Sequence, residues 1–156
     1  MKKHHYEVQV NWTGNQGTGT SHYLDYNRDH ELIIEGKPPI SCSSDTAFRG
    51  DPNKHNPEEL FLYAISSCHM LWYLHLCADA GVIVLSYTDL PTGLMIEEPE
   101  KGKFTEVILR PIIEVREESM IEKAQQMHTK AHLNCFISNS CNFPVMVIPE
   151  IRVKLI

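Results

Sequence analysis

The part of the chain that most restricts its fold is residues 60–78, which contain no aspartate, glutamate, lysine or arginine. A helix start precedes this run. Asn56 suits the N-cap, Pro57 the first helical position, and Glu59 the position whose carboxylate reaches back to the cap. Gly81 is typical of a helix end. The pattern predicts one long helix, apolar on nearly every face, around which the rest of the fold is organised.

The same run approaches the length of a membrane-spanning helix. Polar side chains interrupt it, at Ser66, Ser67, His69 and His75, and it lacks the basic flank that orients a membrane span. The strand-forming remainder of the chain also needs a surface on which to pack. We therefore expect a buried helix and no membrane association.

Composition places the chain among soluble globular proteins, with 42% hydrophobic and 22% charged residues. A length of 156 residues suits a single domain, residues 1–156, with a substantial core. The net charge of −6 disfavours a nucleic-acid partner. No secretory signal is visible at the N-terminus, so we expect a cytoplasmic protein. In a reducing compartment, its five cysteines are expected to be catalytic, metal-bound or inert rather than structural disulfides.

Alternation of apolar and polar residues predicts several strands on either side of the long helix. The expected strands are 6–12, 21–26, 30–35, 82–88, 93–97, 104–115 with a bend at Pro111, and 146–156. Residues 41–55 look like a loop. A second helix is predicted to begin with a capping box of Ser119 and Glu122 and to end near Asn134. Strands, long helix, strands, helix and strand in this order indicate an α+β fold with separate layers.

Two cysteines lie at informative positions, Cys68 in the middle of the long helix and Cys135 just beyond the second helix. A buried helical cysteine is often simply a small core residue. The functional alternative is a peroxide-reactive thiol with a resolving partner, which needs a cation to stabilise its thiolate. Arg28 and Arg49 are the candidate cations. Glu58 complements the helix dipole or holds an arginine in place.

Two other functions are compatible with these residues. His128, His132 and Cys135 follow a spacing that can place three zinc ligands on one helix face, although no fourth ligand is evident. Alternatively, the cysteines are structural and the protein is a non-catalytic binding or structural module. The sequence contains no glycine-rich phosphate loop and no nucleophile elbow.

The segment Asn56-Pro57-Glu58, followed by Ser67-Cys68-His69-Met70 and later by Cys135, resembles the signature of the OsmC/Ohr family of thiol-dependent hydroperoxide reductases. The resemblance covers essentially the whole chain. It implies an OsmC-like α+β fold in which antiparallel sheets wrap around two central helices in an intertwined homodimer. It also implies an enzyme that reduces organic hydroperoxides without a bound cofactor.

The resemblance assigns a role to each site residue. Cys68 matches the peroxidatic cysteine, Cys135 the resolving cysteine, and Glu58 the glutamate of the family motif. Arg28 looks like the activating arginine of the Ohr pattern, with Arg49 as the alternative in OsmC-type members. The implied cycle passes through a Cys68 sulfenic acid and a Cys68–Cys135 disulfide, which a lipoyl-type dithiol or another small thiol reduces.

Two features depart from the family pattern. Phe136 stands where a proline often follows the second cysteine, and Cys141 is an additional thiol close behind. Helix geometry adds a further expectation, because Glu58 and Cys68 are separated by about 15 Å along one helix axis. A two-fold related partner would bring its Glu58 near this Cys68, so we predict a site composed across a dimer interface.

Overall fold

The computed structural model describes residues 2–99 and 101–154. The chain divides into two compact units, Met1–Phe61 and Leu62–Ile156. The expectation of a single domain over residues 1–156 stays a prediction.

The first unit is built on an antiparallel sheet with the strand order β1-β2-β3. Its strands are β1 (Gln9–Trp12), β2 (His30–Ile33) and β3 (Ile40–Cys42). His30 pairs with Trp12 on one side and with Cys42 on the other, which aligns all three strands. A 3₁₀ turn, η1 (Thr46–Phe48), follows the sheet.

Two local predictions for this unit are wrong. Residues 21–26, expected as a strand, form turns and make only an isolated bridge from Tyr26 to Asn15. Within this segment, the N–H of Asp25 donates to the His22 carbonyl at 3.0 Å and the Ser21 hydroxyl donates to the Asp25 carboxylate at 2.8 Å, so turn hydrogen bonds replace strand pairing. The expected loop of residues 41–55 in turn contains the end of β3.

The long helix α1 (Pro57–Asp79) begins as the sequence predicts. The N–H of Glu59 donates to the Asn56 side chain at 2.8 Å, and the Glu59 carboxylate accepts from the Asn56 N–H at 3.3 Å. This reciprocal pair confirms the capping box. At the other end, Gly81 has a φ of 74°, and the N–H of Val82 donates to the Cys77 carbonyl at 2.8 Å. Glycine favours this left-handed conformation, which confirms the predicted stop.

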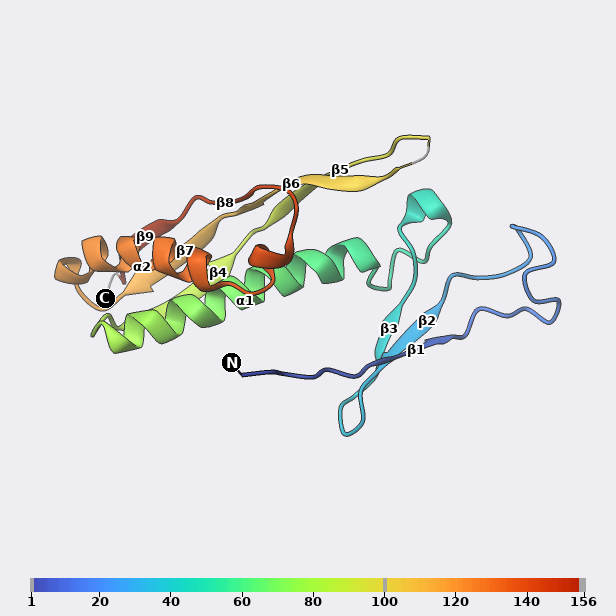
Figure 1. Ribbon diagram of the computed structural model, residues 1–156, viewed down its shortest axis with the longest axis horizontal. Helices are drawn as coiled ribbons and strands as arrows, with labels where there is room; N and C mark the ends of the chain where they lie inside the picture. Colours follow the sequence, from blue (N-terminus) through green and yellow to red (C-terminus); the bar gives the residue numbers. More distant parts are fainter. Residues whose placement is uncertain (1, 100, 155–156) are drawn as a thin grey trace. The chain divides into compact units, whose positions relative to one another are not determined.

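The second unit contains two three-stranded sheets, ordered β4-β7-β9 and β5-β6-β8. Their strands are β4 (Val84–Asp89), β5 (Thr92–Ile96), β6 (Lys103–Leu109), β7 (Pro111–Val115), β8 (Val145–Val147) and β9 (Glu150–Val153). In each sheet the first two strands are antiparallel, and a C-terminal strand is added in parallel. Figure 1 shows that the two sheets follow one another along the length of this unit.

The break between the two sheets confirms the bend expected at Pro111 and turns the single long strand of the prediction into two. Arg110 separates β6 from β7, and its N–H donates to the Asp89 carboxylate at 2.7 Å. Asp89 is the last residue of β4, so the Arg110 N–H bonds to a side chain and takes no part in the backbone hydrogen bonds between strands. The predicted final strand of residues 146–156 is likewise divided into β8 and β9, and its residues 155 and 156 lie outside the described part of the chain.

The second helix, α2 (Ile121–Asn134), lies beside α1 within this unit (Figure 1). Its predicted capping box is wrong. Ser119 lies within a 3₁₀ turn, η2 (Glu118–Met120). The N-cap residue is Met120, which makes no side-chain capping bond. A further 3₁₀ turn, η3 (Ser138–Ser140), follows α2. The two helices and β7 share one core, composed of Tyr73, Cys77, Val82, Ile113, Val115, Ala124, Met127 and Ala131.

The faces of α1 differ in burial, although their hydrophobicity does not. Its fully buried residues form one stripe at a spacing of four: Ile65, His69, Tyr73 and Cys77. Tyr63 and Leu71, on other faces, are 55% and 63% exposed. The sequence therefore predicted the apolar character of the helix correctly, but a single chain covers only one of its faces. The helix is also long and apolar enough to cross a membrane, a property that core helices of soluble proteins share.

Candidate functional site

The structure brings Cys68 and Cys135 into contact within the second unit. The Cys68 thiol, on α1, lies near the Cys135 thiol and near the backbone N–H groups of Phe136 and Ile137, close enough for each to influence its pKa. Both cysteines are free thiols. Cys135 is completely buried, whereas Cys68 is half-buried.

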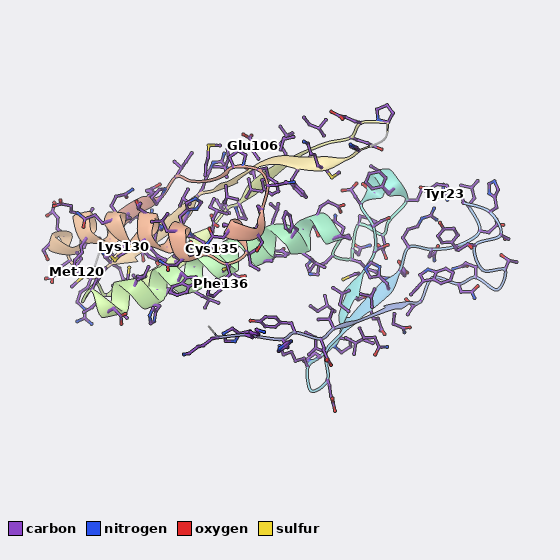
Figure 2. The ribbon with its side chains drawn as sticks, in the orientation of Figure 1. Tyr23, Glu106, Met120, Lys130, Cys135 and Phe136 are labelled. Atoms are coloured by element: carbon purple, nitrogen blue, oxygen red, sulfur yellow. The ribbon has the colours of Figure 1, made fainter. Side chains whose placement is uncertain are left out.

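The end of α2 explains why these groups converge. Cys135 is the C-cap residue and has an extended backbone, with a φ of −69° and a ψ of 104°. The chain therefore leaves the helix at this point, and the N–H groups that follow have no helical acceptor and are directed at the Cys68 sulfur. Figure 2 labels Cys135 and Phe136 at this end of α2, next to α1. The Ser138 hydroxyl donates to the Cys135 sulfur at 3.2 Å.

The electrostatics of this pocket favour a protonated thiol. Burial raises the pKa of Cys68, and the adjacent Cys135 thiol raises it further. The N–H groups of Ile137 and Phe136 act in the opposite direction, because they stabilise a thiolate. The net pKa is nevertheless above the ordinary value of 9.0. A reactive thiolate at this position therefore needs an additional positive charge.

The candidate cations and the glutamate lie in the first unit, whereas both cysteines lie in the second. Arg28 donates to the carbonyl oxygens of Tyr23 and Tyr26, and its guanidinium lies 4.2 Å from the centre of each ring. Arg49 is exposed and adopts a left-handed backbone with a φ of 68°. Of the predicted site residues, Cys68 and Cys135 are thus the pair that the structure brings together within one unit.

Glu58 has an unusual environment for a carboxylate at a helix start. Its Oε2 atom is buried and has no hydrogen-bond partner among the described residues. A buried charge without a partner is costly, so this carboxylate is well placed to receive a cationic side chain.

The sequence analysis missed a buried histidine pair in the second unit. The His69 Nε2 lies 3.0 Å from the His128 Nδ1, the two ring planes are within 6° of parallel, and the Tyr73 ring stacks on His128 at 3.9 Å. Burial lowers the pKa of His69 to about 4 and that of His128 to about 3, so both rings are neutral at neutral pH. A usable signal was present, because His69 lies on the same helical stripe as Ile65 and Tyr73.

The zinc alternative is not supported. Among the described residues, no three histidine, cysteine or carboxylate side chains are arranged to hold a metal ion. His128, one of the three expected ligands, instead directs a ring nitrogen at His69, and Cys135 is engaged with Cys68. The spacing along α2 was compatible with a metal site. However, α2 packs on α1 so that His128 contacts His69 and Cys135 lies beside Cys68.

The chain is similar to several known proteins. Residues 50–150 match the family described as OsmC-like protein. An OsmC-like protein of unknown function from Vibrio cholerae has a similar structure, with a TM-score of 0.82 and 31% identity over 96% of this chain and 99% of the other. The uncharacterised YmaD of Bacillus subtilis is 24% identical over 99% of this chain and 98% of its own length.

A further solved structure is a predicted redox protein of Legionella pneumophila, described as an organic hydroperoxide resistance protein. It has a TM-score of 0.67 and 20% identity, and the match covers 97% of this chain and all of the other. At that identity, the likeness concerns the fold. The family match and the relative from Vibrio cholerae together establish that this chain belongs to the OsmC-like family.

Proposed function

We propose that the protein is a cysteine-based peroxidase that reduces organic hydroperoxides. The observation that carries this proposal is the contact between the thiols of Cys68 and Cys135, one half-buried and the other fully buried. A peroxidatic thiol needs a second thiol close enough to trap its sulfenic acid. The hydroperoxide resistance described for the relative from Legionella pneumophila supports the same activity.

The proposed cycle has three steps. The Cys68 thiolate attacks the distal oxygen of the hydroperoxide, so that an S–O bond forms, the O–O bond breaks, and the alkoxide leaves as an alcohol after taking up a proton. The Cys135 thiol then attacks the Cys68 sulfenic acid, forming a disulfide and releasing water. A lipoyl-type dithiol reduces this disulfide by two exchange steps and becomes a cyclic disulfide, or two molecules of another small thiol do so and become a linear disulfide.

The raised pKa of Cys68 means that the first step needs a cation, for which we propose Arg28, with Arg49 as the alternative. Glu58 would hold that arginine through its unpartnered buried Oε2 atom. Because Glu58 and Cys68 are about 15 Å apart along one helix axis, we propose that the glutamate and arginine come from a partner chain.

A homodimer would also account for the exposed faces of α1. Leu71 and Tyr63 are more than half exposed in one chain, on a helix that is apolar all round. A helix of this kind is normally covered on every side. We propose that a second copy of the chain covers these faces, and that the protein acts in the cytoplasm, where its cysteines are kept reduced between turnovers.

The test is a peroxide-consumption assay with cumene hydroperoxide and dihydrolipoamide as the dithiol. We expect Cys68→Ser to abolish consumption, and Cys135→Ser to prevent repeated turnover while allowing one sulfenic acid per chain. Cys42→Ser is the matched control, since Cys42 is a buried thiol of the first unit. Unchanged peroxide consumption by Cys68→Ser would refute the proposal.

A further inference from the structure

A third thiol lies at the same turn as the cysteine pair. The Cys141 thiol donates to the carbonyl oxygen of Ile137 at 3.3 Å, while the N–H of that same residue is directed at the Cys68 sulfur. Cys141 is close enough to Cys135 that a Cys135 thiolate disfavours a second thiolate at Cys141. A single turn of backbone therefore contacts three sulfur atoms.

The fold of this turn holds the two later cysteines close together. Two 3₁₀-type backbone bonds close it, from Ser140 to Ile137 at 3.0 Å and from Cys141 to Ser138 at 3.1 Å. The N–H of Asn139 also donates to the Cys135 carbonyl at 2.9 Å. The segment between Cys135 and Cys141 is consequently folded back on itself.

The three thiols differ in their access to solvent. Cys135 is 0% exposed, whereas Cys68 and Cys141 are half-buried. Exchange requires the incoming thiolate to reach a sulfur atom, so a dithiol cannot attack Cys135 directly. In a Cys68–Cys135 disulfide, the reductant would have to enter the substrate pocket itself. A disulfide that ends at Cys141 would offer a second accessible sulfur away from Cys68.

We propose that Cys141 is a third redox-active thiol, which displaces Cys68 from the Cys68–Cys135 disulfide and leaves a Cys135–Cys141 disulfide as the form that the dithiol reduces. This inference rests on the peroxidase function proposed above. The Cys141 thiolate attacks the Cys135 sulfur, the Cys135–Cys141 bond forms, and the Cys68–Cys135 bond breaks. Cys68 leaves as a thiolate, so the step needs no external oxidant or reductant. The peroxidatic residue is then ready for another hydroperoxide before the dithiol arrives.

The protonation state of Cys141 sets the pH dependence of this step. Burial raises the pKa of Cys141, and its proximity to Cys135 raises that pKa further. We expect the transfer to be faster at higher pH, because the thiolate is the attacking species.

The first experiment asks whether the second disulfide can form, independently of any peroxide chemistry. A Cys42→Ser, Cys68→Ser, Cys77→Ser chain retains only Cys135 and Cys141, and it is oxidised with diamide, alkylated in acid and mapped by mass spectrometry. We expect an intramolecular Cys135–Cys141 disulfide in the folded protein, as judged by circular dichroism. If both thiols are alkylated instead, the transfer is overturned, whatever the activity of the wild-type enzyme.

The second experiment follows the order of events in a Cys42→Ser, Cys77→Ser background, which keeps the three clustered thiols. After one equivalent of cumene hydroperoxide and an acid quench at increasing times, we expect Cys68–Cys135 first and Cys135–Cys141 later. Adding Cys141→Ser should leave only the first disulfide and slow its reduction by dihydrolipoamide several-fold. Reduction at the same rate, with no Cys135–Cys141 species in the parent, would overturn the transfer. Failure of the peroxide to oxidise any cysteine would instead overturn the proposed peroxidase.

Discussion

The Nε2 atom of His69 on α1 lies 3.0 Å from the Nδ1 atom of His128 on α2, and the two nearly parallel rings share one hydrogen bond inside the second unit. Both side chains are buried, and the ring nitrogens that face away from the pair have no partner among the described residues. The pair joins the two helices just beside the cysteine site. It is also an unsatisfied polar cluster, which makes it sensitive to protonation.

The first prediction is a loss of stability in mild acid. Folding lowers the pKa of His69 to about 4 and that of His128 to about 3, from the ordinary 6.5. Below pH 6.5 the unfolded chain therefore binds protons that the folded chain does not, and the folded state loses on the order of 1 kcal/mol per pH unit for each histidine. Urea unfolding between about pH 7 and about pH 5 measures this slope.

The variant that tests the first prediction is His128→Gln, which cannot be protonated. It should reduce the pH dependence of the unfolding free energy to the contribution of His69, although it lowers stability at neutral pH by removing the hydrogen bond to His69. His4→Gln, at an exposed N-terminal position, is the control and should retain the wild-type slope. An equal slope in His128→Gln and wild type would contradict the assignment.

The second prediction concerns the N-cap of α1. Asn56→Ala removes the acceptor for the Glu59 N–H and should reduce the free energy of unfolding by about 1 kcal/mol. Asn56→Asp preserves an acceptor and should retain most of the stability. Asn53→Ala, in the loop just before the helix, serves as the control because the Asn53 side chain bonds only to Asp51 in the described contacts. Chemical denaturation of all three variants measures the difference.

The third prediction concerns the cation that Cys68 requires. Arg28→Gln should raise the pKa of the Cys68 thiol, because it removes the charge proposed to stabilise the thiolate. The pH dependence of Cys68 alkylation by iodoacetamide, in a chain without the other cysteines, reports this pKa. Arg152→Gln, an exposed arginine in the second unit, is the control.

The outcome of that experiment also separates the two arginines. If the pKa of the Cys68 thiol rises in Arg49→Gln and does not change in Arg28→Gln, then Arg49 is the residue that stabilises the thiolate. No shift in either variant would contradict the requirement for an arginine and leave the amide groups of Phe136 and Ile137 as the stabilising contacts.

The fourth prediction is that the uncovered face of α1 forms a dimer interface. Leu71 is 63% exposed, and Leu71→Glu places a charge on this apolar surface. We expect the variant to sediment as a monomer and to lose peroxidase activity together with the dimer. Gln126→Glu puts the same charge on the exposed face of α2 and should leave the dimer intact. A wild-type protein that is monomeric and fully active would remove the basis for a composite site.

The two ends of α1, which depend on neighbouring residues, were predicted correctly. The N-cap contacts of α1 span three residues, from Asn56 to Glu59, and the glycine stop acts over a similar distance. The start of α2 was misplaced, because Ser119 offers a plausible cap but its backbone is part of a 3₁₀ turn. Residues 21–26, expected as a strand, form turns that the Ser21 and Asp25 side chains stabilise by a hydrogen bond. A short sequence pattern predicts local structure reliably where the backbone has one favourable way to form its hydrogen bonds. The prediction is ambiguous where a turn can satisfy the same groups as a helix or strand.

Sequence was thus sufficient for the long apolar helix, its two ends, the α+β order of elements and the family to which the motif around Cys68 belongs. Long-range packing was needed for the rest. The partner of His69 is 59 residues away, and the Cys68 site is completed by amide groups that are released only because α2 ends at Cys135. Which face of α1 is buried also depended on packing, since its composition is nearly uniform around the helix. Contacts between distant segments leave no local pattern, so their geometry emerges only when the helices meet.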